Sequence, residues 1–295
     1  MTESVLTQVL LPVAIAIIML GMGLSLSLND FTRLFRLPKA VVTGLMGQLL
    51  LLPTVAFALC FAFGLGSEMA VGLMILAACP GGTMSNVISQ LCRANLALSV
   101  TLTACCTLVG IVSTPWLIAV SYQYFVGEVA TDFSLISASL SLMVITLVPI
   151  AIGMMIKHRW QEKAYRIEPY FRKGSSMFMF IMIIAILVQE RTQLIESFSQ
   201  LFWVCLSLNM LTIALGLVLA KIQNLDWQDA LTLAIEIGIQ NATLAILISL
   251  SFLKQSALAL PAGVYGITMY IGAIMLLAAT KVKLTRNECS VNNVS

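Results

Sequence analysis

Nine apolar stretches, separated by short polar segments, dominate this sequence of 295 residues and limit what it can fold into. A helix needs about 20 apolar residues to cross the hydrocarbon core of a bilayer. By that criterion the expected spans are residues 5–28, 40–63, 69–91, 95–122, 134–156, 174–189, 200–220, 228–252 and 257–280. Only 10% of the residues are charged, which is too few to cover a water-exposed surface. We therefore predict an all-α polytopic membrane protein with nine transmembrane helices.

Lysine and arginine residues predict how these spans are oriented, because cytoplasmic loops carry most of both. If the N-terminus lies outside, fourteen of the 16 basic residues fall on the cytoplasmic side, and only Arg191 and Lys254 fall outside. Omitting the short span 174–189 changes the division to twelve against four, so the charges favour nine spans over eight. We therefore expect an outside N-terminus and a cytoplasmic C-terminus.

The polar segments are too short to form domains of their own. The longest expected loop covers residues 157–173, and a polar cytoplasmic tail covers residues 284–295. Residues 1–295 are therefore expected to form a single transmembrane domain in contact with lipid, and its function must sit within the bilayer. These patterns indicate no particular oligomeric state.

Charge and composition argue against several functional classes. A formal net charge of +3 is too small to attract a nucleic acid. The 7 cysteines lie almost all in apolar stretches, without a CxxC pair or companion histidines, which indicates reduced packing residues. An enzyme would need a nucleophile with a base or a metal cluster, but the only histidine, His158, lies in an expected loop. A receptor or channel is a weaker alternative, since no polar lining runs along a whole pore.

Glu236 is the strongest functional clue, because it is the one acidic residue well inside an apolar stretch. An ionised carboxylate at mid-membrane costs at least about 2.5–3.5 kcal/mol and normally has a positive partner. No Lys, Arg or His within another expected span can supply one, so the partner is a mobile cation or a proton. The alternative is a protonated Glu236 that is hydrogen-bonded between helices.

The residues after Glu236 favour a cation site. Gln240 lies four positions further along the same helix face, Gly238 weakens the helix between them, and Asn241 follows. A helix that loosens near the midplane exposes backbone carbonyls, and such backbone is tolerated there only where it lines a cavity. Carboxylate, amide and carbonyl oxygens together suit a hard cation.

The third expected span contains a second break. Pro80 removes a backbone donor, Gly81 and Gly82 add conformational freedom, and Ser85 and Asn86 follow directly. A plain kink is the alternative, but the hydroxyl and amide add oxygen ligands. The next span adds Ser99 and Thr103 at a spacing of four, and the second span contains Gln48, for which an interhelical hydrogen bond is the alternative interpretation.

The two breaks fall at corresponding places if the first four spans match the last four. Asn86 then pairs with Asn241, and the two broken spans cross the membrane in opposite directions. This arrangement is typical of an inverted repeat, whose paired broken helices hold the substrate and ion sites of secondary transporters. The fifth span has no counterpart in this scheme.

At these residues the sequence resembles the bile acid:sodium symporter family. Four ordered motifs carry the resemblance, and together they extend over nearly the whole chain: Gly21-Met-Gly-Leu24, Cys79-Pro-Gly-Gly-Thr-Met-Ser-Asn86, Asn95-Leu-Ala-Leu-Ser99 and Glu236-Ile-Gly-Ile-Gln-Asn241. The resemblance implies a core domain with two crossed, discontinuous helices and a panel domain that moves against it. It also implies a bacterial inner-membrane homologue of the apical sodium-dependent bile acid transporters, in the nine-span form.

Carried over residue by residue, the resemblance implies two co-transported sodium ions. The first would be bound by Ser85, Asn86, Ser99, Thr103 and Glu236, and the second by Gln48, Glu236, Gln240 and the carbonyls of Ile237 and Ile239. Substrate would be bound near Asn86, Asn241, Tyr265, Thr268 and Tyr270. Two sodium ions against one carboxylate leave one positive charge, which favours a monoanionic substrate.

The predicted function is therefore sodium-coupled symport of an organic anion, a bile acid or a similar small carboxylate, by alternating access. The nearest alternative is a proton-coupled carrier or exporter of the same fold, such as an arsenite exporter. An exporter of that kind would rely on a reactive cysteine, and Cys79 lies at the first break.

Overall fold

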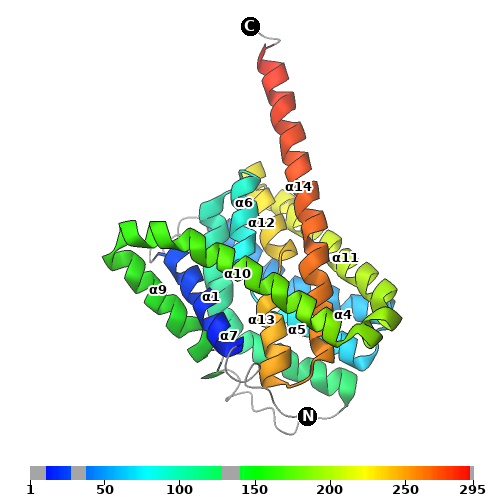
Figure 1. Ribbon diagram of the computed structural model, residues 1–295. Helices are drawn as coiled ribbons and strands as arrows, with labels where there is room; N and C mark the ends of the chain where they lie inside the picture. The colour runs from blue at the N-terminus through cyan, green and yellow to red at the C-terminus, as the bar shows by residue number, and fades with distance from the viewer. Residues whose placement is uncertain (1–10, 28–37, 128–139, 142, 293–295) are drawn as a thin grey trace.

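The computed structural model describes residues 11–27, 38–127, 140–141 and 143–292, and within this part the chain is helical without a single β-strand (Figure 1). Residues 5–10 of the first predicted span and 134–139 of the fifth lie outside it. The all-α fold class is confirmed.

Within the described ranges the helices follow one another with short connections. The α-helices are α1 (Leu11–Ser25), α3 (Pro38–Met46), α4 (Leu52–Ala62), α5 (Ser67–Ala78), α6 (Thr83–Leu91), α7 (Leu96–Val126), α9 (Val148–Arg159), α10 (Gln161–Gln189), α11 (Arg191–Ile222), α12 (Trp227–Gly238), α13 (Ala242–Leu247) and α14 (Leu260–Asn292). Shorter turns of π- or 3₁₀-helix complete the list: η3 (Gly47–Leu51), η4 (Met143–Leu147), η5 (Ile248–Phe252) and η6 (Ala257–Ala259).

Four helices in the described part are long and apolar enough to cross a membrane: Pro38–Ala62, Leu96–Val126, Arg191–Ile222 and Ala257–Lys281. Shorter apolar helices cover Ile15–Ser25, Ser67–Ala78 and Ala242–Phe252. The last two are halves of the interrupted spans that the sequence predicts, which is why each is too short to cross alone. The total of nine spans remains a prediction.

The helices pack in two groups. Helix α1 packs against α9 and α10, and Figure 1 shows α1 and α9 together at the left. In the other group, α11 packs against α12 and α14, and α5 packs against α7. The groups meet where α10 contacts α14 and where α1 contacts α13. The interrupted helices thus lie in the second group, with the first group against one side.

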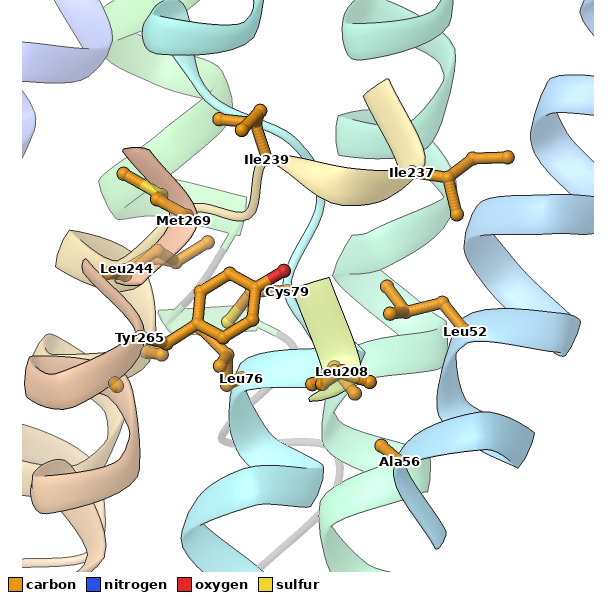
Figure 2. Packing of buried hydrophobic residues seen from close by; sticks show 14 of the residues in the cluster. Leu52, Ala56, Leu76, Cys79, Leu208, Ile237, Ile239, Leu244, Tyr265 and Met269 are labelled. Carbon is orange, nitrogen blue, oxygen red and sulfur yellow. The ribbon is translucent and has the colours of Figure 1, made fainter. Parts of the chain in front are cut away.

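Helices α5 and α12 are buried along nearly their whole length. Leu73, Ile75 and Leu76 on α5 and Ala234 and Ile235 on α12 have no exposed surface. A helix that is apolar on all sides belongs inside a larger bundle. Figure 2 shows side chains of α4, α5, α11, α12 and α14 gathered around the two interruptions, with the ring of Tyr265 reaching in from α14. Polar groups placed here are shielded from water and lipid alike.

Candidate functional site

The first interruption covers Cys79 to Gly82, between the end of α5 at Ala78 and the start of α6 at Thr83. Cys79 is extended, with φ −74° and ψ 139°. Pro80 has no N–H to continue the hydrogen-bond ladder of α5, which disfavours extending the helix through it. Thr114 on α7 donates to the carbonyl of Ala78 at 2.6 Å and thereby satisfies one of the acceptors freed at the end of α5.

The second interruption covers Ile239 to Asn241. Helix α12 ends at Gly238, and Ile239 is extended, with φ −114° and ψ 104°. The Asn241 side chain then accepts a hydrogen bond from the Leu244 amide at 3.1 Å, which is the capping contact that begins α13.

The two interruptions cross each other. Gly81 and Gln240 form an isolated antiparallel backbone bridge, although 159 positions separate them in the sequence. A Cβ atom added at Gly81 would lie 3.0 Å from Oε2 of Glu236, and one added at Gly82 would lie 3.3 Å from Cγ of Asn241. Both glycines therefore leave little room for a side chain, since a Cβ at either position would require Glu236 or Asn241 to shift by a few tenths of an ångström.

Glu236 lies beside this crossing and is 4% exposed. Thr103 donates to its Oε2 at 2.9 Å, and the Ser99 hydroxyl bonds to its Oε1. The same Ser99 hydroxyl lies 2.8 Å from the amide oxygen of Asn86. Ser85 lies next to Gly81, and its hydroxyl donates to the Gly82 carbonyl at 2.8 Å. The structure thus brings together all five side chains that the resemblance assigns to the first ion.

Hydroxyl groups are the only donors to Glu236 among the described residues, and no basic side chain pairs with it there. Two hydroxyl bonds compensate for only part of the cost of removing a carboxylate from water. The oxygens of this site come from the Glu236 carboxylate, one amide and three hydroxyls. Together they are ligands for a hard cation.

Gln48, Gln240 and the end of α12 form a second polar group beside the first. Gln48 Nε2 donates to Gln240 Oε1 at 2.7 Å and to the carbonyl of Cys79 at 3.2 Å. Gln240 Nε2 lies 2.8 Å from the Ile237 carbonyl. Gln48 therefore makes the interhelical bonds of the alternative interpretation and also ties both interruptions together. It lies in the π-helical turn η3, a distortion that often marks functional positions.

The Gly238 carbonyl accepts hydrogen bonds from side chains of two other helices, α11 and α14. Tyr265 donates to it at 2.8 Å, and Asn209 donates to it at 2.7 Å. Tyr265 is completely buried, and in this conformation its hydroxyl is hydrogen-bonded to the last residue of α12. Asn209 did not stand out in the sequence, although it is the only amide side chain in the stretch 201–220.

Thr268 and Tyr270 on α14 and Asn241 are the remaining predicted substrate residues. Thr268 is buried, with its hydroxyl 3.4 Å from the Tyr265 carbonyl, and Tyr270 is half-buried. A cavity of about 20 Å³ lies beside Pro80 and Asn241, which is room for about one water molecule. A cavity of about 610 Å³, lined by residues of α9, the segment after α1 and Gln161, contains none of the residues of the crossing.

Comparison with known proteins gives one consistent result. Residues 12–197 match the model of the Sodium Bile acid symporter family, a stretch that contains the first interruption and stops before α12. The chain is 32% identical over 284 residues to the uncharacterized sodium-dependent transporter YocS of Bacillus subtilis (strain 168), covering 95% of this chain and 86% of that one. It is 30% identical over 253 residues to the ileal sodium/bile acid cotransporter of Oryctolagus cuniculus, covering 84% and 72%. A rice protein named "Probable sodium/metabolite cotransporter BASS2, chloroplastic" is 28% identical over 271 residues, covering 90% and 62%.

Proposed function

This chain belongs to the sodium bile acid symporter family, and from that premise we propose that it couples the entry of two sodium ions to the uptake of a small organic anion. The family is one of membrane transporters, so family membership supports a sodium-dependent transport function. The ion number, the class of substrate and the mechanism are the proposal.

The observation that carries the proposal is the buried carboxylate of Glu236 at the crossing of the two interrupted helices, with hydroxyl donors and no basic partner among the described residues. In the proposal, one sodium ion binds Glu236 with Ser85, Asn86, Ser99 and Thr103. The other binds Glu236 with Gln48, Gln240 and the carbonyls of Ile237 and Ile239. Ser99 and Thr103 of the first group bond to Glu236, and in the second group Gln240 bonds to the carbonyl of Ile237, the residue after Glu236. This adjacency supports two neighbouring ions.

The charge of this site favours the class of substrate. Two sodium ions and one ionised Glu236 leave one positive charge, so a monoanion such as a bile acid or another small carboxylate would neutralise it. Asn86 and Asn241 lie at the crossing and are the first candidates to contact such an anion, with Tyr265, Thr268 and Tyr270 on α14 as further candidates. The relatives that carry the words bile acid or metabolite in their names fit this class.

Alternating access between the two groups of helices is the mechanism that we propose. We assign α1, α9 and α10 to the panel domain, and the group with the interrupted helices to the core domain of an inverted repeat with nine spans. The small cavity at Pro80 and Asn241 is lined by Met19 and Met22 of α1 as well as by the core helices. Movement of α1 away from the core would enlarge it. Sodium promotes transport only if it binds the substrate-competent conformation better than the other one.

Orientation and location belong to the same proposal. The distribution of lysine and arginine favours an outside N-terminus and a cytoplasmic C-terminus. The family resemblance is the basis for proposing a bacterial inner membrane. In this orientation the loops α6–α7 and α11–α12 face the cytoplasm.

The experiment that tests the proposal is the thermal stability of purified protein in sodium against potassium at equal ionic strength. A ligand at 100 times its Kd stabilises the native state by about 2.7 kcal/mol, so the wild type is expected to melt higher in sodium. Glu236→Gln is expected to lose this difference, while Glu162→Gln, which removes an exposed carboxylate, is expected to keep it. An equal response of wild type and Glu236→Gln would contradict the assignment.

A proton-coupled carrier or an arsenite-exporter-like protein is the alternative within this fold, and Cys79 at the first interruption is the residue that raises it. Its side chain is 1% exposed and lies in the apolar core (Figure 2). Buried cysteines in apolar surroundings are usually inert. Transport that is blocked by a thiol reagent in the wild type but not in Cys79→Ser would favour this alternative.

A further inference from the structure

Two polar stripes face each other on helices that are otherwise apolar. On α12 the stripe consists of Asp229, Thr232 and Glu236, at spacings of three and four residues. On α7 it starts at the capping residue Asn95 and continues with Ser99 and Thr103 at spacings of four. Residues with these spacings lie on one face of a helix. All of them except Asn95 are buried.

Hydrogen bonds join the stripes at both ends. At one end, the side chain of Asn95 donates through Nδ2 to Asp229 Oδ1 at 2.7 Å. Its backbone N–H donates to Thr232 Oγ1 at 3.0 Å. At the other end, Ser99 and Thr103 bond to Glu236. Helices α7 and α12 are therefore in register over about two turns, with polar groups at each level of their contact.

Helix α6 forms a third wall, since it packs against both α7 and α12. Ser85 and Ser89, four residues apart on its buried face, have no exposed surface. Ser85 lies next to Gly81 and so beside Glu236, whereas the Ser89 hydroxyl has no hydrogen-bond partner among the described residues. Leaving a buried hydroxyl unpaired is unfavourable, and an oxygen-binding ligand passing this level would satisfy it. We refer to the contact of α6, α7 and α12 from Glu236 to Asp229 as the polar seam.

Asp229 is the second buried carboxylate of the polar seam. It is 7% exposed, and the Asn95 amide is the only side chain that donates to it within the described residues. Seven residues separate it from Glu236, a rise of about 10 Å along α12. Asp226, one turn earlier, is exposed and caps α12 by accepting from the Asp229 amide at 2.8 Å. Asp226 thus caps α12, whereas Asp229 lies in the first turn, where the helix dipole favours a carboxylate, and is in addition buried against Asn95 of α7.

From this geometry we propose that the polar seam is the path by which sodium moves between Glu236 and the α6–α7 and α11–α12 loops, and that Asp229 is a separate, weaker cation site on this path. The inference rests on the proposed sodium coupling. The seam supplies hydroxyl, amide and carboxylate oxygens at successive levels, so an ion that leaves Glu236 is not transferred directly into an apolar contact. In the proposed orientation the path leads to the cytoplasm, where co-transported sodium has to be released.

The direct test uses the wild-type protein and a hydrophobic carbodiimide, which modifies buried carboxylic acids when they are protonated. Bound sodium keeps a carboxylate ionised and thus protects it. Mass spectrometry after modification in sodium or in potassium then reports each carboxylate separately. We expect sodium to protect Glu236 at low concentration and Asp229 at a concentration about tenfold higher or more, and to leave the exposed Asp226 unaffected.

The outcomes separate this inference from the proposed function. Protection of Glu236 without protection of Asp229 would overturn the inference and leave the proposed sodium coupling intact. Absence of protection at both carboxylates would overturn both. Equal protection of Asp229 by sodium and potassium would show a general ionic effect and would also overturn the inference.

A matched set of variants tests the role of charge. Asp229→Asn keeps the size of the side chain and an oxygen for Asn95 but removes the charge, so its melting temperature in potassium should stay near that of the wild type. Its midpoint for stabilisation by sodium should rise about two- to tenfold, since a charge about 10 Å from the ion is lost. Asp229→Glu should restore the midpoint, and Asp226→Asn should leave it unchanged. Equal midpoints for Asp229→Asn and the wild type would contradict the proposal.

Discussion

The two interrupted helices reach the same crossing but are shaped by different means. Between α5 and α6, a proline and two glycines occupy the interruption, so the local sequence itself ends the helix. Between α12 and α13, the interruption consists of Ile239, Gln240 and Asn241, none of which prevents a helix. There the side chains of Asn209 and Tyr265, from two other helices, hold the Gly238 carbonyl. The first break is encoded strongly by its own residues. The second has weaker local signals, Gly238 and the Asn241 cap, and is also held by its neighbours.

We infer from this difference that the two breaks have different roles at the proposed ion site. Glu236 and the carbonyl of Ile237 lie in the last turn of α12, directly before the second break, and the Gly238 carbonyl between them and the break is held by the outside anchors. The first break contributes its shape and the close approach of Gly81 to Glu236. We therefore expect mutations of the anchors to act on sodium affinity at the second break, and mutations of the corresponding anchor at the first break to act on stability alone.

The largest effect is expected from the double variant Asn209→Leu/Tyr265→Phe, which removes both donors to the Gly238 carbonyl. A buried carbonyl without a partner costs about 1–3 kcal/mol. The segment should shift to find another donor and move the Ile237 carbonyl with it. We expect a lower melting temperature and a midpoint for sodium stabilisation that is at least about tenfold higher, as measured by thermal melts over a series of sodium concentrations.

A control for this variant removes a buried hydroxyl elsewhere. Thr43 donates to the carbonyl of Lys39 within α3 at 2.7 Å, so Thr43→Val should leave the sodium midpoint unchanged. If the double variant binds sodium like the wild type, the second break does not depend on Asn209 and Tyr265, and the two breaks do not differ in this respect.

A smaller effect is expected from Gly81→Ala at the first break. The added Cβ would lie 3.0 Å from Oε2 of Glu236, so the carboxylate must move or the crossing must open. Overpacking of this kind typically costs about 1–3 kcal/mol, part of which neighbouring side chains can relieve. We expect the sodium midpoint to rise about three- to tenfold in the same melting assay.

Gly263→Ala is the matched control, because its Cβ would have Leu187 as nearest neighbour at an ordinary 3.7 Å. Alanine is also the better helix former, so this variant should be at least as stable as the wild type. A sodium midpoint that rises equally in both variants would show that the close contact with Glu236 is not the cause.

Thr114→Val tests whether the first break depends on a side chain from another helix, because it removes the anchor of that break. Its hydroxyl donates to the Ala78 carbonyl at 2.6 Å, and interhelical hydrogen bonds in membrane proteins contribute about 0.6 kcal/mol on average. Pro80 and the glycines still end α5 in this variant. We expect a melting temperature lower by a few degrees and an unchanged sodium midpoint; a large change in the midpoint would mean that the first break also depends on its anchor.

The same contrast explains which features the sequence could predict. Pro80, Gly81 and Gly82 act on their own backbone, and a single carboxylate in an apolar stretch is unfavourable wherever that stretch folds. These local signals predicted the first interruption and drew attention to Glu236, and Gly238 predicted the second interruption after it. The family resemblance carried by the motifs around them is confirmed by the family comparison.

The parts that could not be predicted depend on partners distant in the sequence. Asn209 and Tyr265 meet Gly238 across 29 and 27 positions, and Asn95 meets Asp229 across 134. A lone amide or hydroxyl in an apolar helix has many ways to be satisfied, including bonds within its own helix. Its spacing therefore does not identify its partner, and packing decides. Tyr265 illustrates this point. The sequence predicts a contact with substrate, and the structure contains a hydrogen bond from its hydroxyl to the Gly238 carbonyl.

The smallest effect is expected from Tyr265→Phe alone, and it decides between the two roles of this residue. Asn209 still donates to the Gly238 carbonyl at 2.7 Å, so loss of the tyrosine hydroxyl should cost about 0.5–1 kcal/mol and raise the sodium midpoint less than about threefold. In an Asn209→Leu background the same substitution removes the last donor, so its effect there should be larger than in the wild type. A double-mutant cycle measures this difference as a coupling energy, which contacting residues show and independent ones do not. If the cycle shows no coupling but the single variant lowers organic-anion uptake at saturating sodium, Tyr265 acts on the substrate, and Asn209 alone anchors the second break.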